Sequence, residues 1–162
     1  MYFQDATLCF QQWQSCASCH PNDARVDGLN WDLLNDGAGN PKNTKSLLLS
    51  HQTPPCMITG IRKNAEMAVR SGLKFIHFAS VPDEIAQAMD EYLKGLIPVA
   101  SPYLVGGRLS EAAERGKVNF DKHCASCHSG PYYTDMKQYM VDWTTPRDHV
   151  PMDDLAVYIL SL

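Results

Sequence analysis

Apolar side chains recur every three or four residues in four stretches of the chain, a spacing that places them on one face of an α-helix. These stretches are 64–77, 82–96, 109–120 and 151–162. Pro82 and Pro151 stand where proline favours a first helical turn, and Ser110 is suited to cap the third stretch. The pattern therefore predicts an all-α protein.

The second and fourth predicted helices end with the same residue pattern, which indicates an internal repeat. Residues 92–96 and 158–162 both place a tyrosine next to a large aliphatic residue and a leucine three positions later. Between the two halves, residues 98–107 contain two prolines and end in paired glycines, a composition typical of a linker. We therefore predict a first domain at 1–97, a linker at 98–107 and a second, smaller domain at 108–162.

One short motif occurs in each half, letter for letter. Residues 16–20 and residues 124–128 both spell Cys-Ala-Ser-Cys-His. Two thiols three positions apart on a helical turn can react with the two vinyl groups of a porphyrin, and the adjacent histidine then reaches the iron. The motif thus predicts two covalently bound c-type haems. The attachment residues are Cys16, Cys19, Cys124 and Cys127, and the proximal iron ligands are His20 and His128.

Two paired cysteine motifs also suit a tetrahedral zinc ion or a thiol redox pair. Zinc does not require a histidine at the fifth position of both motifs, so haem is the favoured interpretation. The chain is then a dihaem cytochrome.

The arrangement around the second motif resembles the class I cytochrome c fold, in which an opening helix with a glycine and an aromatic residue crosses a closing helix with an aromatic residue. Gly116, Phe120 and Tyr158 match these positions. The resemblance implies two class I cytochrome c-like haem domains in tandem.

More specifically, the chain resembles the dihaem cytochrome c peroxidase superfamily, with a shortened second unit. The segments 43–47, 53–55 and 60–62 are similar to that family's Thr-Pro-Ser-Leu-Arg-Asn and Asp-Gly-Arg stretches. Asp36 stands where family peroxidases often carry a histidine, and Thr59 stands where they carry an aspartate. These departures favour single-electron transfer between redox partners, without catalytic residues. The alternatives are a dihaem peroxidase that reduces hydrogen peroxide and a subunit of a multi-haem electron conduit.

The sixth ligand of each iron sets its behaviour, because methionine raises the potential, a second histidine lowers it and an empty position permits catalysis. For the first haem, Met57 is the favoured ligand, since it lies in a proline-rich loop 37 residues after His20. Met67, His51 and His77 are the other candidates.

For the second haem, Met140 and His149 are the main candidates, because Met136 is predicted to be helical and His123 adjoins the proximal motif. Met140 is slightly favoured, since it lies in the middle of a loop with chain on both sides to cross the haem. An empty site or a ligand from another subunit also remains open. Only 22 residues separate His128 from Pro151, so we expect the second haem's distal face to be covered from outside residues 108–162, with self-association as one route.

The charge and hydropathy of the chain limit which partners it can bind. The formal net charge is −4, and haem propionates would add negative charge, which argues against nucleic acid and favours redox partners with basic docking patches. No apolar run approaches the ~18 residues of a membrane span.

Covalent haem attachment predicts a periplasmic or extracellular protein, and the lack of a signal peptide suggests that the given chain is a mature form or a fragment. Cys9 and Cys56 are not used by the haem motifs, and they form either a disulfide or two separate thiols.

Residues 28–39 are rich in Asp and Asn but do not match a calcium loop. We therefore expect a loop at the edge of the haem, in which Trp31 packs on the porphyrin or between the units.

Overall fold

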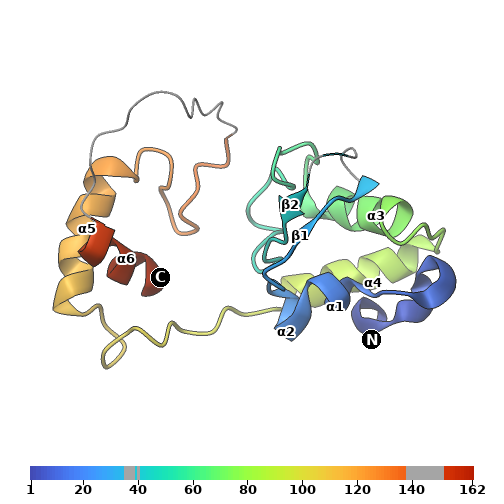
Figure 1. The fold of residues 1–162 in the computed structure, drawn as a ribbon, viewed down its shortest axis with the longest axis horizontal. Coiled ribbons are helices and arrows are strands. Elements are labelled where there is room, and N and C mark those ends of the chain that lie inside the picture. The colour runs from blue at the N-terminus through green and yellow to red at the C-terminus, as the bar shows by residue number, and fades with distance from the viewer. Residues whose placement is uncertain (35–38, 40, 138–151) are drawn as a thin grey trace. The chain divides into compact units, whose positions relative to one another are not determined.

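A computed structural model describes residues 1–34, 39, 41–137 and 152–162 (Figure 1). The chain divides into two compact units, Met1–Ile97 and Pro98–Leu162. The described residues are mainly helical, as the sequence predicts. The sheet that they contain is one antiparallel pair of two-residue strands, in which Asn30 pairs with Asn43 and Trp31 with Lys42.

The first unit opens with three short 3₁₀ turns and two single-turn helices, and ends with two longer helices. Its elements are η1 (Tyr2–Gln4), η2 (Ala6–Leu8), η3 (Phe10–Gln12), α1 (Cys16–Cys19), α2 (Pro21–Ala24), β1 (Asn30–Trp31), β2 (Lys42–Asn43), α3 (Ala65–Phe75) and α4 (Asp83–Lys94). α3 and α4 lie against each other, and η1 contacts both α1 and α4 (Figure 1).

The two long helices of this unit begin where their sequence signals predict. The side chain of Asn64 accepts a hydrogen bond from the backbone N–H of Met67 at 3.0 Å, which caps α3. α4 begins directly after Pro82, and Asp83 and Glu84 in its first turn complement the helix dipole. The buried face of α4 carries Ala86, Met89, Asp90 and Leu93. Asp90 is the unexpected member, a carboxylate on an apolar stripe.

The second unit is built on a crossing between α5 (Glu111–His123) and α6 (Met152–Leu160) (Figure 1). Ser110 caps α5 by accepting a hydrogen bond from the N–H of Ala113 at 3.2 Å, as predicted. Gly116 lies at the crossing, where an added Cβ would collide with the backbone carbonyl of Asp154 and lie 2.9 Å from Cβ of Tyr158. The close approach of the two helices therefore depends on glycine at this position.

Four buried side chains fill the α5–α6 interface: Ala113, Phe120, Leu155 and Tyr158. Cys124 and Ala125 of the second motif pack against this cluster. The glycine and the two aromatic residues that the sequence singled out thus belong to one core, directly beside the second Cys-Ala-Ser-Cys-His motif.

No helix of the described residues is both long enough and apolar enough to cross a membrane.

Candidate haem sites

The first motif forms a single helical turn. Ser15 precedes α1, and its backbone N–H donates to Oγ of Ser18 at 3.0 Å. The N–H of His20 donates to the carbonyl of Cys16 at 2.9 Å, which closes the turn. The local fold therefore places two cysteines and a histidine within five residues of one turn, as haem attachment requires.

The surroundings of this motif suit an uncharged thioether better than a thiolate. Cys16 packs in both apolar clusters of the first unit. Burial raises the pKa of the Cys16 thiol to about 11 and also raises the pKa of Cys19. A thioether to a haem vinyl group leaves the cysteine uncharged, which suits this apolar packing. The chemistry of the cysteines therefore fits haem.

The surroundings of His20 favour the neutral form of its imidazole. Burial lowers the pKa of its imidazole. Its Nδ1 atom is buried without a hydrogen-bond partner among the described residues. A neutral imidazole in such a position is the form that binds iron.

The second motif follows α5 and repeats the same closing hydrogen bond. The N–H of His128 donates to the carbonyl of Cys124 at 2.9 Å, and Nδ1 of His128 lies 3.0 Å from the carbonyl oxygen of Tyr133. Because a carbonyl only accepts, Nδ1 carries the hydrogen and Nε2 remains available as a ligand atom. This arrangement fits the second haem's proximal histidine.

Three aromatic side chains pack together next to the second motif. The ring of Phe120 lies 5.7 Å from that of Tyr133 and 5.3 Å from that of Tyr158, both in edge-on geometry. Burial raises the pKa of Tyr158. In the first unit, Phe3 and Tyr92 form a similar pair with ring centroids 5.1 Å apart. Each motif therefore has a neighbouring aromatic pair that can exclude water.

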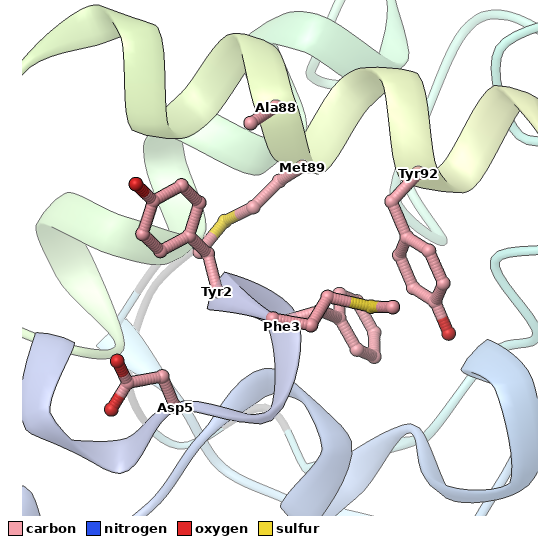
Figure 2. Close-up of a pocket in the computed structure, with 7 residues that line it drawn as sticks. Tyr2, Phe3, Asp5, Ala88, Met89 and Tyr92 are labelled. Atoms are coloured by element: carbon pink, nitrogen blue, oxygen red, sulfur yellow. The ribbon is translucent and has the colours of Figure 1, made fainter.

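A pocket of about 270 Å³ opens beside the aromatic pair of the first unit, between η1 and α4 (Figure 2). It is lined by Met1, Tyr2, Phe3, Asp5, Ala88, Met89 and Tyr92. Histidine and cysteine are absent from this lining, and it includes none of the predicted site residues.

Met57 begins a tight loop that is closed by hydrogen bonds in both directions between the backbones of Cys56 and Arg62, at 2.8 and 3.3 Å. Its φ angle of 72° is a conformation that few non-glycine residues adopt. The structure does not test whether its sulfur faces iron, so this ligand stays a prediction. Met67 is 45% exposed on α3.

His77 is the sixth-ligand candidate that the structure brings into contact with the first motif. Its side chain is buried, and its Nε2 atom lies 3.9 Å from Sγ of Cys16. Burial lowers the pKa of His77. The sequence favoured Met57 over this histidine, because a histidine near the end of a helix is more often an ordinary polar residue.

The burial of His77 predicts an acid-sensitive fold. The folded protein holds His77 neutral, whereas the unfolded chain binds a proton there as the pH falls through about 6.5, so unfolding becomes more favourable in acid. We expect His77→Leu to reduce the loss of unfolding free energy between pH 7 and pH 5, measured by urea denaturation. His123→Gln, at an exposed position, is the control. Equal pH dependence in the wild type and His77→Leu would contradict this expectation.

The predicted ligands of the second haem, Met140 and His149, lie outside the described residues. Asp36, at the position of the family's histidine, also lies outside them. The prediction that Met136 is helical is wrong: it has a φ of 59° and follows a loop whose ends are joined by a hydrogen bond from the N–H of Asp135 to the carbonyl of Cys127 at 3.1 Å. A positive φ does not continue a right-handed helix.

The two remaining cysteines are separate thiols in the structure. Cys9 is buried, and Sγ of Cys56 donates to the carbonyl of Ser50 at 3.7 Å.

In the loop considered for calcium, residues 28–39, the indole Nε1–H of Trp31 donates to Asp27 at 2.8 Å. Within the described ranges, no three His, Cys, Asp or Glu side chains converge as a metal-binding group.

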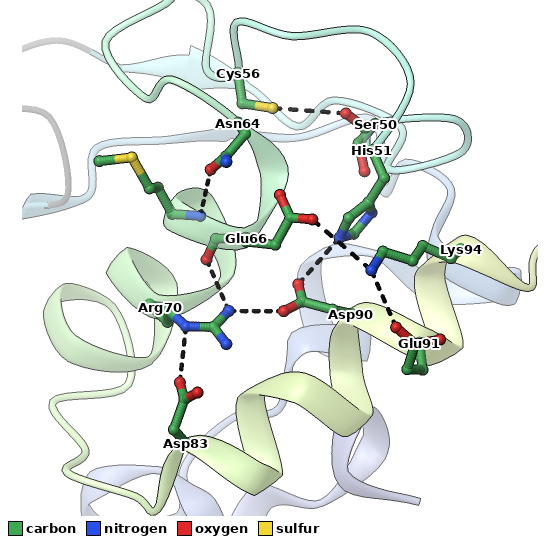
Figure 3. Close-up of polar contacts among 11 residues, drawn as sticks. Ser50, His51, Cys56, Asn64, Glu66, Arg70, Asp83, Asp90, Glu91 and Lys94 are labelled. Carbon is green, nitrogen blue, oxygen red and sulfur yellow. Dashed lines mark hydrogen bonds and ion pairs between the residues drawn. The ribbon is translucent and has the colours of Figure 1, made fainter.

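One polar cluster was missed by the sequence analysis altogether. His51, Asp90, Arg70 and Asp83 form a continuous chain of hydrogen bonds between the loop after β2 and helices α3 and α4 (Figure 3). A signal did exist, because Asp90 follows Ala86 by four residues and precedes Leu93 by three, and therefore lies on the apolar stripe of α4.

The fold and the two motifs define a mainly helical protein with two potential haem c attachment sites. No family model matches the chain. It is similar to hydrazine synthase subunit gamma of Kuenenia stuttgartiensis, with 31% identity over 144 residues, which are 79% of this chain and 40% of that protein. A solved structure of hydrazine synthase from the same organism matches with a TM-score of 0.75 and 27% identity, over 84% of this chain and 50% of the matched chain. The chain thus spans half or less of the length of these relatives.

These comparisons correct the predicted membership of the dihaem cytochrome c peroxidase superfamily. The comparisons find a hydrazine synthase subunit and a hydrazine synthase structure, and no family model matches. The resemblance rested on three short stretches, 43–47, 53–55 and 60–62, which match that family only in part. Matches of so few residues separate families poorly.

Proposed function

We propose that this chain is a dihaem c-type cytochrome that transfers single electrons as one subunit of a larger redox assembly. The observation that carries the proposal is the identical five-residue motif in both units, each closed by the same 2.9 Å hydrogen bond from the histidine N–H to the first cysteine. A bound c-type haem supplies an iron that cycles between the ferric and ferrous states. Each unit is then a class I cytochrome c-like domain with its own haem.

The chain's own residues would fix and shield the cofactors. Cys16, Cys19, Cys124 and Cys127 would hold the porphyrins, and His20 and His128 would bind the irons. Tyr92 and Tyr158, with their phenylalanine partners, would exclude water from one side of each site. Burial of this kind raises a haem's potential, because it disfavours the more highly charged ferric form.

Similarity to hydrazine synthase subunit gamma supports the assembly. We infer that other protein chains contact this one, and its net charge of −4 favours basic surfaces on its electron donors and acceptors. The second haem's distal face would be covered from outside residues 108–162. Covalent haem attachment favours a periplasmic or extracellular location.

A redox titration tests this function. The purified protein should take up two electrons per chain in two one-electron steps, each reversible and each accompanied by the optical change of a c-type haem. Uptake of one electron per chain, or of none, would reject the dihaem carrier. The experiment needs no knowledge of the natural partners.

A further inference from the structure

His51 is held by a buried carboxylate. Its Nε2 atom lies 3.0 Å from Oδ1 of Asp90, and the two side chains are 6% and 4% exposed (Figure 3). The other oxygen of Asp90 accepts a hydrogen bond from Nη1 of Arg70 at 2.7 Å. Arg70 also donates from Nε to Asp83 at 2.8 Å and from Nη1 to the carbonyl of Glu66 at 3.1 Å.

These contacts fix which nitrogen of His51 carries hydrogen. A carboxylate paired with a guanidinium only accepts, so Nε2 of His51 must donate to Asp90. In a neutral imidazole, Nδ1 is then a bare lone pair. Nδ1 of His51 is buried and has no hydrogen-bond partner among the described residues. A buried polar atom of this kind is costly unless something binds it.

The arrangement is the one that metal-binding histidines use. Such a histidine usually donates its second N–H to a carboxylate, which fixes the tautomer and raises the basicity of the ligating nitrogen. Here Asp90 takes the carboxylate role, and Arg70 holds Asp90 in place.

The segment that carries His51 runs along the first motif. Lys45 lies just after β2, at the start of the loop that carries His51. Two residues after Lys45, the N–H of Leu47 donates to the carbonyl of Ala24 at 2.8 Å, and a turn then returns Ser50 N–H to Leu47 at 3.1 Å.

The carboxylate partner of His51 lies on the buried face of α4. Asp90 lies one helical turn before Leu93 on α4. Leu93 packs in the cluster that includes Cys16, Ala17 and Ala24. His51 and the first motif therefore meet the same face of α4.

We propose that His51 is the sixth ligand of the first haem iron, bound through Nδ1 and oriented by Asp90. The proposal rests on the proposed function, because it requires a haem on Cys16 and Cys19. It gives the first haem two histidine ligands, His20 and His51, in place of the His20–Met57 pair that the sequence favours. Two histidines lower the potential relative to histidine and methionine, so this haem would be the low-potential site of the chain.

The test compares His51→Ala with Met57→Ala in the full-length holoprotein by electron paramagnetic resonance and near-infrared magnetic circular dichroism. We expect His51→Ala to convert one of the two haems to the high-spin form, and added imidazole to restore the low-spin signal. Met57→Ala should leave both haems as in the wild type. A high-spin haem in Met57→Ala together with an unchanged spectrum in His51→Ala would overturn the proposal.

Two further measurements keep the result decisive. In the wild type, at least one haem should show the near-infrared band of two axial imidazoles. Methionine-ligand bands from both haems would reject His51 as a ligand, even if His51→Ala fails to fold.

Asp90→Asn should raise the reduction potential of one haem, because an amide gives the His51 imidazole less negative charge than a carboxylate does. An unchanged potential counts against the proposal. The mass of each denatured variant reports covalent haem separately, so loss of haem itself would contradict the proposed function instead.

Discussion

A variant carrying Cys16→Ala and Cys19→Ala is expected to hold one covalent haem instead of two and to lose the cooperative fold of residues 1–97. Cys16 lies in both apolar clusters of this unit. The buried hydrophobic side chains among the described residues of this unit are few, and three of them are alanines: Phe3, Cys9, Ala24, Ala65, Leu73, Ala86, Met89 and Leu93. A cofactor that completes a core contributes its binding free energy to folding. Denatured mass reports the haem count, and hydrogen exchange reports the fold of residues 1–97.

The control for this variant is Cys9→Ala. Cys9 is also buried in the first unit but belongs to neither motif, so its loss should leave both haems attached. Cys124→Ala with Cys127→Ala should remove the other haem and spare the first unit. Two haems on the Cys16/Cys19 variant would show that these cysteines are not attachment sites.

Replacing Gly116 with Ala is expected to destabilise the second unit by about 1–3 kcal/mol, the usual cost of forcing extra atoms into a packed interface. The added Cβ would collide with the Asp154 carbonyl, and the two helices can relieve this only by moving apart. Separation would loosen the Phe120–Tyr158 contact and the Arg115–Asp154 ion pair at 2.8 Å. Urea denaturation, followed through the haem absorbance of the second unit, measures the change.

Gly72→Ala is the matched control for the glycine substitution. Gly72 lies within α3, and a Cβ added there would meet nothing within 4 Å. Alanine is the better helix former by about 0.5–1 kcal/mol, so this variant should be slightly more stable than the wild type. Equal effects of the two substitutions would show that the α5–α6 crossing does not depend on glycine.

Much of the local structure was predictable, because it follows from local rules. The caps of α3 and α5 and the start of α4 depend on single residues next to an apolar stripe. The resemblance to class I cytochrome c placed Gly116, Phe120 and Tyr158 correctly in one core. The short strands β1 and β2 were not predicted, because two residues are too few to show a period.

The polar interior was not predictable in the same way. His51 and Asp90 are 39 positions apart, and their pairing depends on how the loop after β2 returns to α4. The contact of His77 with Cys16 spans 61 positions. Such long-range contacts leave no periodic trace in the sequence. The family assignment failed for a different reason, since it rested on stretches of three to five residues, which are too short to separate one haem-protein family from another.

The most direct test of the account is the intact mass of the purified protein under denaturing conditions. Thioether bonds survive denaturation, whereas zinc and non-covalent haem are released. The account predicts the mass of the polypeptide plus two haem groups. The mass of the bare polypeptide, or a native protein that contains zinc and no haem, would contradict it.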